Sequence, residues 1–214
     1  MSISIDLQAP DAGTIQDAAR VIRAGGIVLY PSDTIYGLGC DPFNESALSR
    51  VFEIKGRSSG QGMLVLVASL EWVDELAVAR PVVFDRLAER FWPGPVTMLL
   101  QARHHLPRLL KGREGKIGVR FPFSRFLRQW MDRIPGPLVS TSANRSGREP
   151  SGVVQELKDE FGGQVDLVLE ANQLCGRQPS TVIDLAGDNP YVIREGAQCQ
   201  EVKHFLGTLG ETGF

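Results

Sequence analysis

The chain has 214 residues, of which 43% are hydrophobic and 22% are charged, and its formal net charge is −2 at pH 7. This composition excludes a disordered or fibrous protein, and the length fits one domain with a substantial core. The near-neutral charge excludes a polycation, so any affinity for phosphate or nucleic acid must come from local patches.

The cysteines and the N-terminal residues bear on the compartment. Cys40, Cys175 and Cys199 make an odd number without metal-ligand spacing, which predicts no disulfide framework and a cytoplasmic protein. Residues 1–10 lack a basic segment followed by an apolar run, so we expect no signal peptide. No apolar stretch approaches the roughly 18 residues of a membrane-spanning helix, so we expect no association with a membrane.

Helical and extended patterns alternate along the chain. A first helix is expected between Thr14, a candidate N-cap, and Gly25, which would stop it. Asn44 and Ser124 are candidate N-caps of two later helices. The predicted helices after the first are 44–54, 81–91, 124–131, 153–161 and 202–209, and the predicted strands are 27–30, 63–67, 96–100, 117–120, 138–140, 165–169, 182–185 and 191–193.

This alternation favours a layered α/β fold. Only the short turn 187–190 separates the last two strands, which predicts antiparallel pairing between them and hence a mixed sheet. In open α/β sheets, ligands bind beyond the strand ends, where the loops diverge. Five polar or basic clusters fall at or near such positions and are the candidate sites.

The first two clusters suit small polar and phosphate ligands. Residues 31–39, PSDTIYGLG, combine hydroxyls with glycine N–H groups after a strand, although an ordinary turn also explains them. Residues 55–62, KGRSSGQG, set Lys55 and Arg57 among small residues, where two cations can hold a phosphate chain. The spacing is not that of a Walker A loop, and cations that complement a helix C-terminus are the alternative.

The third cluster is the basic stretch 103–128. It contains eight Lys and Arg residues, and Glu114 is its only acid. The stretch suits an anion cavity or the backbone of tRNA, although solvated loop charge is the simpler role for most of its members. Arg120 differs because it ends an apolar strand just before Pro122, so we expect its side chain in a site or in a buried ion pair.

The last two clusters lie in the second half of the chain. Residues 140–147, STSANRSG, hold four hydroxyls and one amide after a short strand, more polar groups than a turn needs. Ser180 precedes one late strand and Arg194 ends the next, so pairing of these strands would bring the two residues together; separately, a turn serine and a surface arginine explain them. No catalytic triad or acidic pair is evident, and the inventory suits binding and stabilisation of negative charge.

Taken together, these segments resemble the YrdC-like family of threonylcarbamoyl-AMP synthases over nearly the whole chain. The resemblance rests on motifs in a fixed order: YPSDTIYGLG, Lys55-x-Arg57, FWPGPVTMLL, GVRFP, STSANRSG and PST…VIRE. It implies a twisted mixed α/β sheet flanked by helices, with a large basic cavity, and residues 1–214 are expected to form a single domain of this type. The additional C-terminal domain of longer family members is not expected.

The resemblance also implies a reaction and a set of site residues. Threonine, bicarbonate and ATP would give threonylcarbamoyl-AMP and pyrophosphate, with Mg²⁺ arriving on ATP and no dedicated protein metal site. A separate transferase complex would then modify tRNA. Direct contact between this chain and tRNA is left open, and DNA binding is not expected. The ATP-binding residues would be Lys55 and Arg57, which are also the catalytic pair, with Ser140, Ser142, Asn144 and Arg194. The threonine-binding residues would be Ser32, Thr34, Arg120 and Ser180.

Two departures and two alternatives accompany the resemblance. Ser32 replaces the usual Thr, and Ser58, Gly62 and Met63 replace the usual prolines and leucine, which predicts a more flexible loop after Lys55. A YrdC-like paralogue that binds RNA without making the adenylate is one alternative. A carbamoyl-adenylating module of the hydrogenase-maturation type is the other, but the acylphosphatase-like and zinc-finger segments expected beside it are not seen in this sequence.

Overall fold

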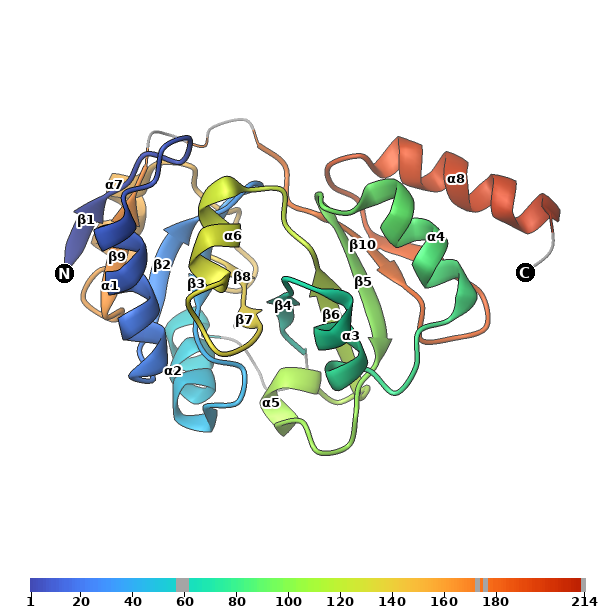
Figure 1. The fold of residues 1–214 in the computed structure, drawn as a ribbon, viewed down its shortest axis with the longest axis horizontal. Coiled ribbons are helices and arrows are strands. Elements are labelled where there is room, and N and C mark those ends of the chain that lie inside the picture. The colour runs from blue at the N-terminus through green and yellow to red at the C-terminus, as the bar shows by residue number, and fades with distance from the viewer. Residues whose placement is uncertain (57–61, 172–173, 175–176, 213–214) are drawn as a thin grey trace.

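Strands and helices alternate along the chain and build two sheets that are covered by helices (Figure 1). The structure is a computed structural model that describes residues 1–56, 62–171, 174 and 177–212. Within these residues the strand directions are mixed in both sheets, which confirms the predicted mixed α/β class.

The first sheet has five strands among the described residues, in the order β1-β9-β2-β3-β8. β9 lies parallel to both β1 and β2, whereas β3 is antiparallel to β2 and to β8. The antiparallel register sets Tyr30 opposite Gly37. The strands are β1 (Ser2–Ser4), β2 (Val28–Pro31), β3 (Tyr36–Gly39), β8 (Thr141–Ser142) and β9 (Leu167–Glu170).

The second sheet has six strands in the described part of the chain, in the order β11-β10-β5-β6-β4-β7. β5 is parallel to β10 and antiparallel to β6, and β10 is antiparallel to β11, as the short turn between them predicts. The strands are β4 (Leu64–Leu66), β5 (Val96–Gln101), β6 (Lys116–Arg120), β7 (Leu138–Val139), β10 (Thr181–Asp184) and β11 (Tyr191–Arg194).

The helices begin at side-chain caps in three cases. Asn44 Oδ1 accepts from the Ala47 N–H and Ser124 Oγ from the Leu127 N–H, which confirms both predicted caps. The prediction of Thr14 as the first cap is wrong: Asp11 caps the helix and its carboxylate accepts from the Thr14 N–H. The helices are α1 (Ala12–Arg23), α2 (Glu45–Lys55), α3 (Leu70–Leu76), α4 (Val82–Phe91), α5 (Arg108–Lys111), α6 (Arg125–Met131), α7 (Val154–Phe161) and α8 (Cys199–Thr212).

The segment from β7 to β8 passes from one sheet to the other at Ser140. The Val139 N–H donates to the Cys40 carbonyl at 3.0 Å, and the Ser140 N–H donates to the Leu64 carbonyl at 2.8 Å. Consecutive residues therefore bond to strand ends in different sheets. This crossing brings the polar ends of both sheets to the same region of the molecule.

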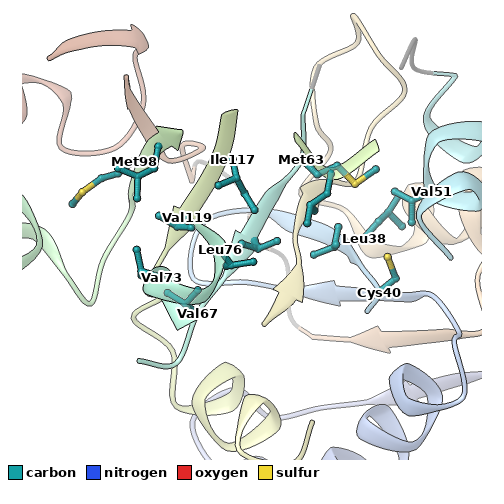
Figure 2. Packing of buried hydrophobic residues seen from close by; sticks show 14 of the residues in the cluster. Leu38, Cys40, Val51, Met63, Val67, Val73, Leu76, Met98, Ile117 and Val119 are labelled. Atoms are coloured by element: carbon teal, nitrogen blue, oxygen red, sulfur yellow. The ribbon is translucent and has the colours of Figure 1, made fainter. Parts of the chain in front are cut away.

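Buried side chains hold the two sheets together. One cluster runs without a break from Leu38, Cys40 and Val51 on the first sheet and α2 to Val119 and Met98 on the second sheet (Figure 2). A second cluster packs α1 and α6 against strands of both sheets. Because one core spans the two sheets, the region between their ends is fixed by packing on both sides.

The sequence prediction missed five elements: β1, β3, β8, α3 and α5. β3 was expected to be part of a polar loop, because Gly37 and Gly39 interrupt its apolar pattern. These glycines lie under the Tyr30 ring: a Cβ at Gly39 would lie 2.8 Å from the ring, so the close approach requires glycine. The short elements β1, α3 and α5 were not predicted either. No helix among the described residues is long and apolar enough to cross a membrane.

Candidate functional site

A cavity of about 790 Å³ lies where the two sheets meet, between β3 and β8 on one side and β10, β5 and β6 on the other. Of the ten site residues predicted above, Arg57 lies outside the described residues. The other nine all line this cavity: Ser32, Thr34, Lys55, Arg120, Ser140, Ser142, Asn144, Ser180 and Arg194. The structure thus brings residues from five separate segments around one space, while their individual roles remain predictions.

Lys55 ends α2 and anchors the loop that follows β8. Its side chain is buried, with only 4% of the residue exposed. The ammonium donates to the carbonyls of Ser142 and Asn144 at 2.5 and 2.8 Å, and Asn144 Oδ1 lies 3.4 Å away. The Ser146 N–H donates in turn to the Lys55 carbonyl. A positive charge is thereby fixed beside the cavity, and the loop is held to the helix end.

Asn144 organises the turn beyond this lysine. Its amide nitrogen donates to the carbonyls of Arg145 and Arg148 at 3.2 and 2.5 Å, so both ends of the side chain are bonded. Arg145 pairs with Glu160 on α7 at 3.0 Å. The loop is therefore held by its own hydrogen bonds, and its residues Ser142, Asn144 and Ser146 line the cavity in a defined arrangement.

Ser140 marks the crossing between the sheets and is bonded to a buried tyrosine. The Tyr30 hydroxyl donates to Ser140 Oγ at 2.6 Å. Burial raises the pKa of Tyr30 above its ordinary value, so the phenol stays neutral and remains a donor at neutral pH. This bond sets the orientation of the Ser140 hydroxyl at the cavity wall.

Ser32 and Thr34 form a compact turn after β2. The Ser32 hydroxyl accepts from the Thr34 N–H at 3.1 Å and donates to the Ile35 carbonyl at 2.6 Å. The two hydroxyl oxygens lie 3.0 Å apart and both residues are buried. The turn that was the simpler explanation of this segment is present, and it places both hydroxyls in the lining of the cavity.

Arg120 is held in a buried ion pair, as its place at the end of an apolar strand predicts. Its Nη1 donates to both carboxylate oxygens of Asp33 at 2.8 Å, and only 2% of the Arg120 side chain is exposed. Asp33 also accepts from the Phe123 N–H at 2.9 Å. Arg120 Nε is buried without a partner in the described part of the chain. Sequence reasoning placed Asp33 in the first cluster but gave it no role.

Ser180 and Arg194 lie together, as predicted from the pairing of β10 with β11. Arg194 Nε and Nη2 donate to the Ser180 carbonyl at 3.2 and 3.0 Å, and Nη2 also donates to Ser180 Oγ at 3.0 Å. On the other side, Ser180 Oγ lies 2.8 Å from Thr97 Oγ1. Thr97 lines the cavity and was missed, because it lies inside an apolar strand pattern.

The basic stretch 103–128 divides between cavity and surface. Lys111, Lys116 and Arg120 line the cavity, whereas Arg103, Arg108, Arg113, Arg125 and Arg128 are exposed elsewhere. Lys116 pairs with Asp184 at 2.7 Å and with Glu114 at 2.9 Å. These hydrogen bonds raise the pKa of Lys116, the bond to Asp184 most strongly. Most residues of the basic stretch are therefore solvent-exposed charges, as the simpler explanation in the sequence analysis proposed.

The described lining carries more positive than negative side chains. Its cations are Lys55, Lys111, Lys116, Arg120, Arg148 and Arg194, against the acids Glu114, Glu149 and Glu195. No group of three His, Cys, Asp or Glu side chains that would hold a metal ion occurs in the described residues. Hydroxyls, N–H groups and an excess of cations suit an anionic ligand better than a bare metal ion. Fold and cavity define an α/β protein with a ligand-sized polar cavity between two mixed sheets.

Comparison with known proteins agrees with this architecture. A family model described as "Telomere recombination", named for Sua5, YciO and YrdC, matches residues 20–196. The chain belongs to this Sua5/YciO/YrdC family.

Two curated relatives and two solved structures are similar to most of this chain. A threonylcarbamoyl-AMP synthase of Pseudomonas fluorescens is 39% identical over 82% of this chain and 94% of its own length. The Pyrococcus abyssi synthase is 32% identical over 91% of this chain, which spans 58% of that protein's length. The crystal structure of P. abyssi Sua5 complexed with L-threonine has a TM-score of 0.89 and is 30% identical, covering 96% of this chain and 60% of that one. Escherichia coli YciO has a TM-score of 0.84 and is 31% identical, covering 92% of this chain and 96% of its own.

Proposed function

We propose that this protein is an L-threonylcarbamoyladenylate synthase, a nucleotidyltransferase that makes threonylcarbamoyl-AMP and pyrophosphate from L-threonine, bicarbonate and ATP. The observation that carries the proposal is the gathering of nine predicted site residues, from five segments, around one cavity. Relatives that carry the synthase name are 32–39% identical to this chain over most of its length.

In this proposal, ATP lies along the loop after β8. Lys55 supplies a fixed positive charge, the hydroxyls of Ser140 and Ser142 supply donors for phosphate oxygens, and Asn144 holds the turn in place. Arg194 reaches the same cavity from β11. Arg57 is proposed to join Lys55 on the phosphates. Magnesium is proposed to enter as part of the MgATP substrate, bound by the phosphates.

Threonine is proposed to lie at the ends of β2, β6 and β10. Ser32 and Thr34 present hydroxyls there, and Ser180 presents a third. Arg120, held by Asp33, is part of the cavity lining, and its guanidinium suits the threonine carboxylate. The pair with Asp33 lets a buried arginine remain charged without a ligand, which isolated burial would oppose.

The chemistry requires little from a side-chain nucleophile. The threonine amine and bicarbonate form a carbamate with loss of water. A carbamate oxygen then attacks the α-phosphorus of ATP, the bond to the β-phosphate bridging oxygen breaks, and pyrophosphate leaves with that electron pair. Positioning of the two substrates and neutralisation of the growing charge are what the residues of the cavity contribute.

The test is pyrophosphate release by the purified protein. Release that requires MgATP, L-threonine and bicarbonate together supports the synthase, and omission of any one should abolish it. The product mass should equal AMP plus a threonylcarbamoyl group. Absence of release together with tight tRNA binding would instead favour an RNA-binding paralogue without synthase activity.

The remaining partners follow from the product. Threonylcarbamoyl-AMP is a mixed anhydride that must be consumed by a separate transferase, so we propose a threonylcarbamoyl transferase complex that acts on tRNA as the downstream partner. Direct tRNA contact through exposed members of the basic stretch remains a proposal that filter binding at two salt concentrations would test. A cytoplasmic location is proposed because Cys40 and Cys199 are buried free thiols.

A further inference from the structure

The strand ends that face the proposed threonine site form a row across the second sheet. The parallel register pairs Val182 with Thr97, and the antiparallel register pairs Met98 with Val119. Continuing the second register by one residue sets Thr97 beside the position of Arg120. Thr97 therefore lies between Ser180, the residue just before β10, and Arg120 at the end of β6, at the centre of the row.

The Thr97 side chain lies on the face of the sheet that forms the floor of the cavity. Gly118, on the neighbouring strand, also lines this floor, and a Cβ there would lie 3.3 Å from the Thr97 methyl carbon. Leu99 lies beside it on the same face. Only 2% of Thr97 is exposed, so its hydroxyl has almost no access to water outside the cavity.

The contact between Thr97 and Ser180 can run in two directions, because either hydroxyl can be the donor. The printed partner of the Thr97 hydroxyl among the described residues is Ser180 Oγ, at 2.8 Å. Either direction leaves one hydroxyl proton without an acceptor among the described residues, that of Thr97 if Ser180 donates and that of Ser180 if Thr97 donates. A ligand oxygen beside Ser180 accepts the Ser180 proton and so selects donation by Thr97. With Thr97 as the donor, Ser180 Oγ accepts from Thr97 and from Arg194 Nη2, at 3.0 Å.

This direction decides what Ser180 can offer a ligand. A serine hydroxyl has one proton and two lone pairs. Donation by Thr97 and by Arg194 uses both lone pairs, so the Ser180 proton must point away from both residues. Since Ser180 lines the cavity, that proton is then directed towards the space between the sheets.

We propose that Thr97 is a positioning residue that turns Ser180 into an obligatory hydrogen-bond donor to an anionic oxygen of the amino-acid substrate. The inference rests on the proposed function and extends it to a residue that sequence reasoning missed. Thr97 acts through Ser180 and does not itself touch the reacting atoms.

The test compares Thr97→Val, which keeps the shape and removes the hydroxyl, with Thr97→Ser, which keeps the hydroxyl. Thr97→Val should raise the KM and the calorimetric Kd for threonine about tenfold, the loss expected for one hydrogen bond to a charged group, with an unchanged KM for ATP. Thr97→Ser should restore values near those of the wild type. Equal threonine affinity in Thr97→Val and wild type would overturn the proposal.

A matched control lies on the next strand. Thr181 is buried, and its hydroxyl donates to the Ala197 carbonyl and accepts from the Gly196 N–H, outside the cavity lining. Thr181→Val should lower the melting temperature without changing the KM for threonine. If it raises that KM as much as Thr97→Val, the effect is structural and the proposal fails.

A double-mutant cycle asks whether Thr97 acts through Ser180. In the Ser180→Ala background, Thr97→Val should have no further effect on threonine affinity. Additive effects would overturn the mechanism. Measurements of threonine binding and of turnover distinguish this proposal from the proposed function. A wild type that binds threonine but releases no pyrophosphate refutes the synthase proposal. The ratio of the threonine Kd values of wild type and Thr97→Val then still tests the role of Thr97. A wild type that binds no threonine overturns both.

Discussion

The ammonium of Lys55 lies 2.8 Å from the main-chain carbonyl oxygen of Asn144 and 3.4 Å from its side-chain oxygen. The two residues are 89 positions apart in the sequence, yet they join the end of α2 to the loop after β8. Because the lysine is buried, its charge and its hydrogen bonds cannot be replaced by water without opening the loop. Charge placement and loop shape at the proposed nucleotide site therefore depend on the same side chain.

We predict that Lys55→Met lowers kcat/KM for ATP by about 100-fold or more, because hydrogen bonds to a charged group contribute about 1.5–3 kcal/mol each. The variant should also melt at a lower temperature, since the carbonyls of Ser142 and Asn144 lose their donor. Initial rates of pyrophosphate release over a range of ATP concentrations measure the first effect.

Lys158 provides the control for this prediction. Its ammonium pairs with Glu170 at 2.8 Å, but it lies on α7 outside the cavity lining. Lys158→Met should leave the KM for ATP unchanged. Near-normal ATP use by Lys55→Met would remove Lys55 from the nucleotide site and leave it as a loop anchor.

The second prediction concerns the buried pair of Arg120 and Asp33. Asp33→Ala should destabilise the fold by about 3–5 kcal/mol, because it leaves the Arg120 charge buried and unpaired. Urea unfolding followed by fluorescence measures the change. In the surface pair Arg20–Asp17 the nitrogen–oxygen distance is 2.7 Å, close to the 2.8 Å of the buried pair, but the Arg20 side chain is 70% exposed. Asp17→Ala should therefore cost less than about 1 kcal/mol, and equal costs at the two sites would contradict this account.

The sequence indicates which polar residues lie at the strand ends, but it does not indicate which residues they contact. Caps such as Asn44 are local hydrogen bonds, so their residue types reveal them. The pair of Asp33 and Arg120 joins residues 87 positions apart, and no local pattern indicates it. Thr97 looks like an ordinary strand residue until the register with β10 is known.

The sequence does not predict that the strands divide into two sheets, for a similar reason. The strand predicted over 138–140 ends at Val139 as β7, and an unpredicted short strand, β8, follows Ser140 in the other sheet. That break depends on which carbonyls lie within reach of each N–H group, the Cys40 carbonyl in one sheet and the Leu64 carbonyl in the other. Local residue preferences cannot encode such a choice of partner.

The third prediction is a pH dependence of stability that involves Asp184. Burial alone would raise its pKa, but the hydrogen bonds from Lys116 and from the Ala186 N–H outweigh burial and hold the pKa below its ordinary value. The unfolded chain therefore takes up a proton at this carboxyl first as the pH falls. The stabilisation is complete above the unfolded pKa of about 4 and is lost as the pH falls through the lower folded value.

Asp184→Asn tests this dependence. The variant should be less stable than the wild type by about 1–3 kcal/mol at pH 7, since the amide cannot replace the charged acceptor of Lys116. The difference should shrink as the pH is lowered below about 4. Urea midpoints at several pH values measure it, and a difference that stays constant down to pH 2 would show that the carboxylate charge is not responsible.

The fourth prediction concerns Gly62, where the related family usually has proline. The resemblance predicted a more flexible loop, and most of that loop lies outside the described residues. Gly62 itself is closely packed: a Cβ there would lie 3.0 Å from the carbonyl oxygens of both Leu110 and Lys116. The adjoining Met63 N–H donates to the Leu110 carbonyl at 2.8 Å, so that oxygen is held in place. The approach of two backbone segments, α5 and β6, explains the glycine.

Gly62→Ala should therefore destabilise the protein by about 1–3 kcal/mol, as overpacking against a backbone does. Gly207→Ala is the control with the opposite sign. Gly207 lies inside α8 with nothing within 4 Å of its added Cβ, so alanine should stabilise the helix there by about 0.5–1 kcal/mol. Thermal unfolding of both variants measures the contrast. A Gly62→Ala variant as stable as the wild type would mean that α5 or β6 can move to accommodate the added Cβ.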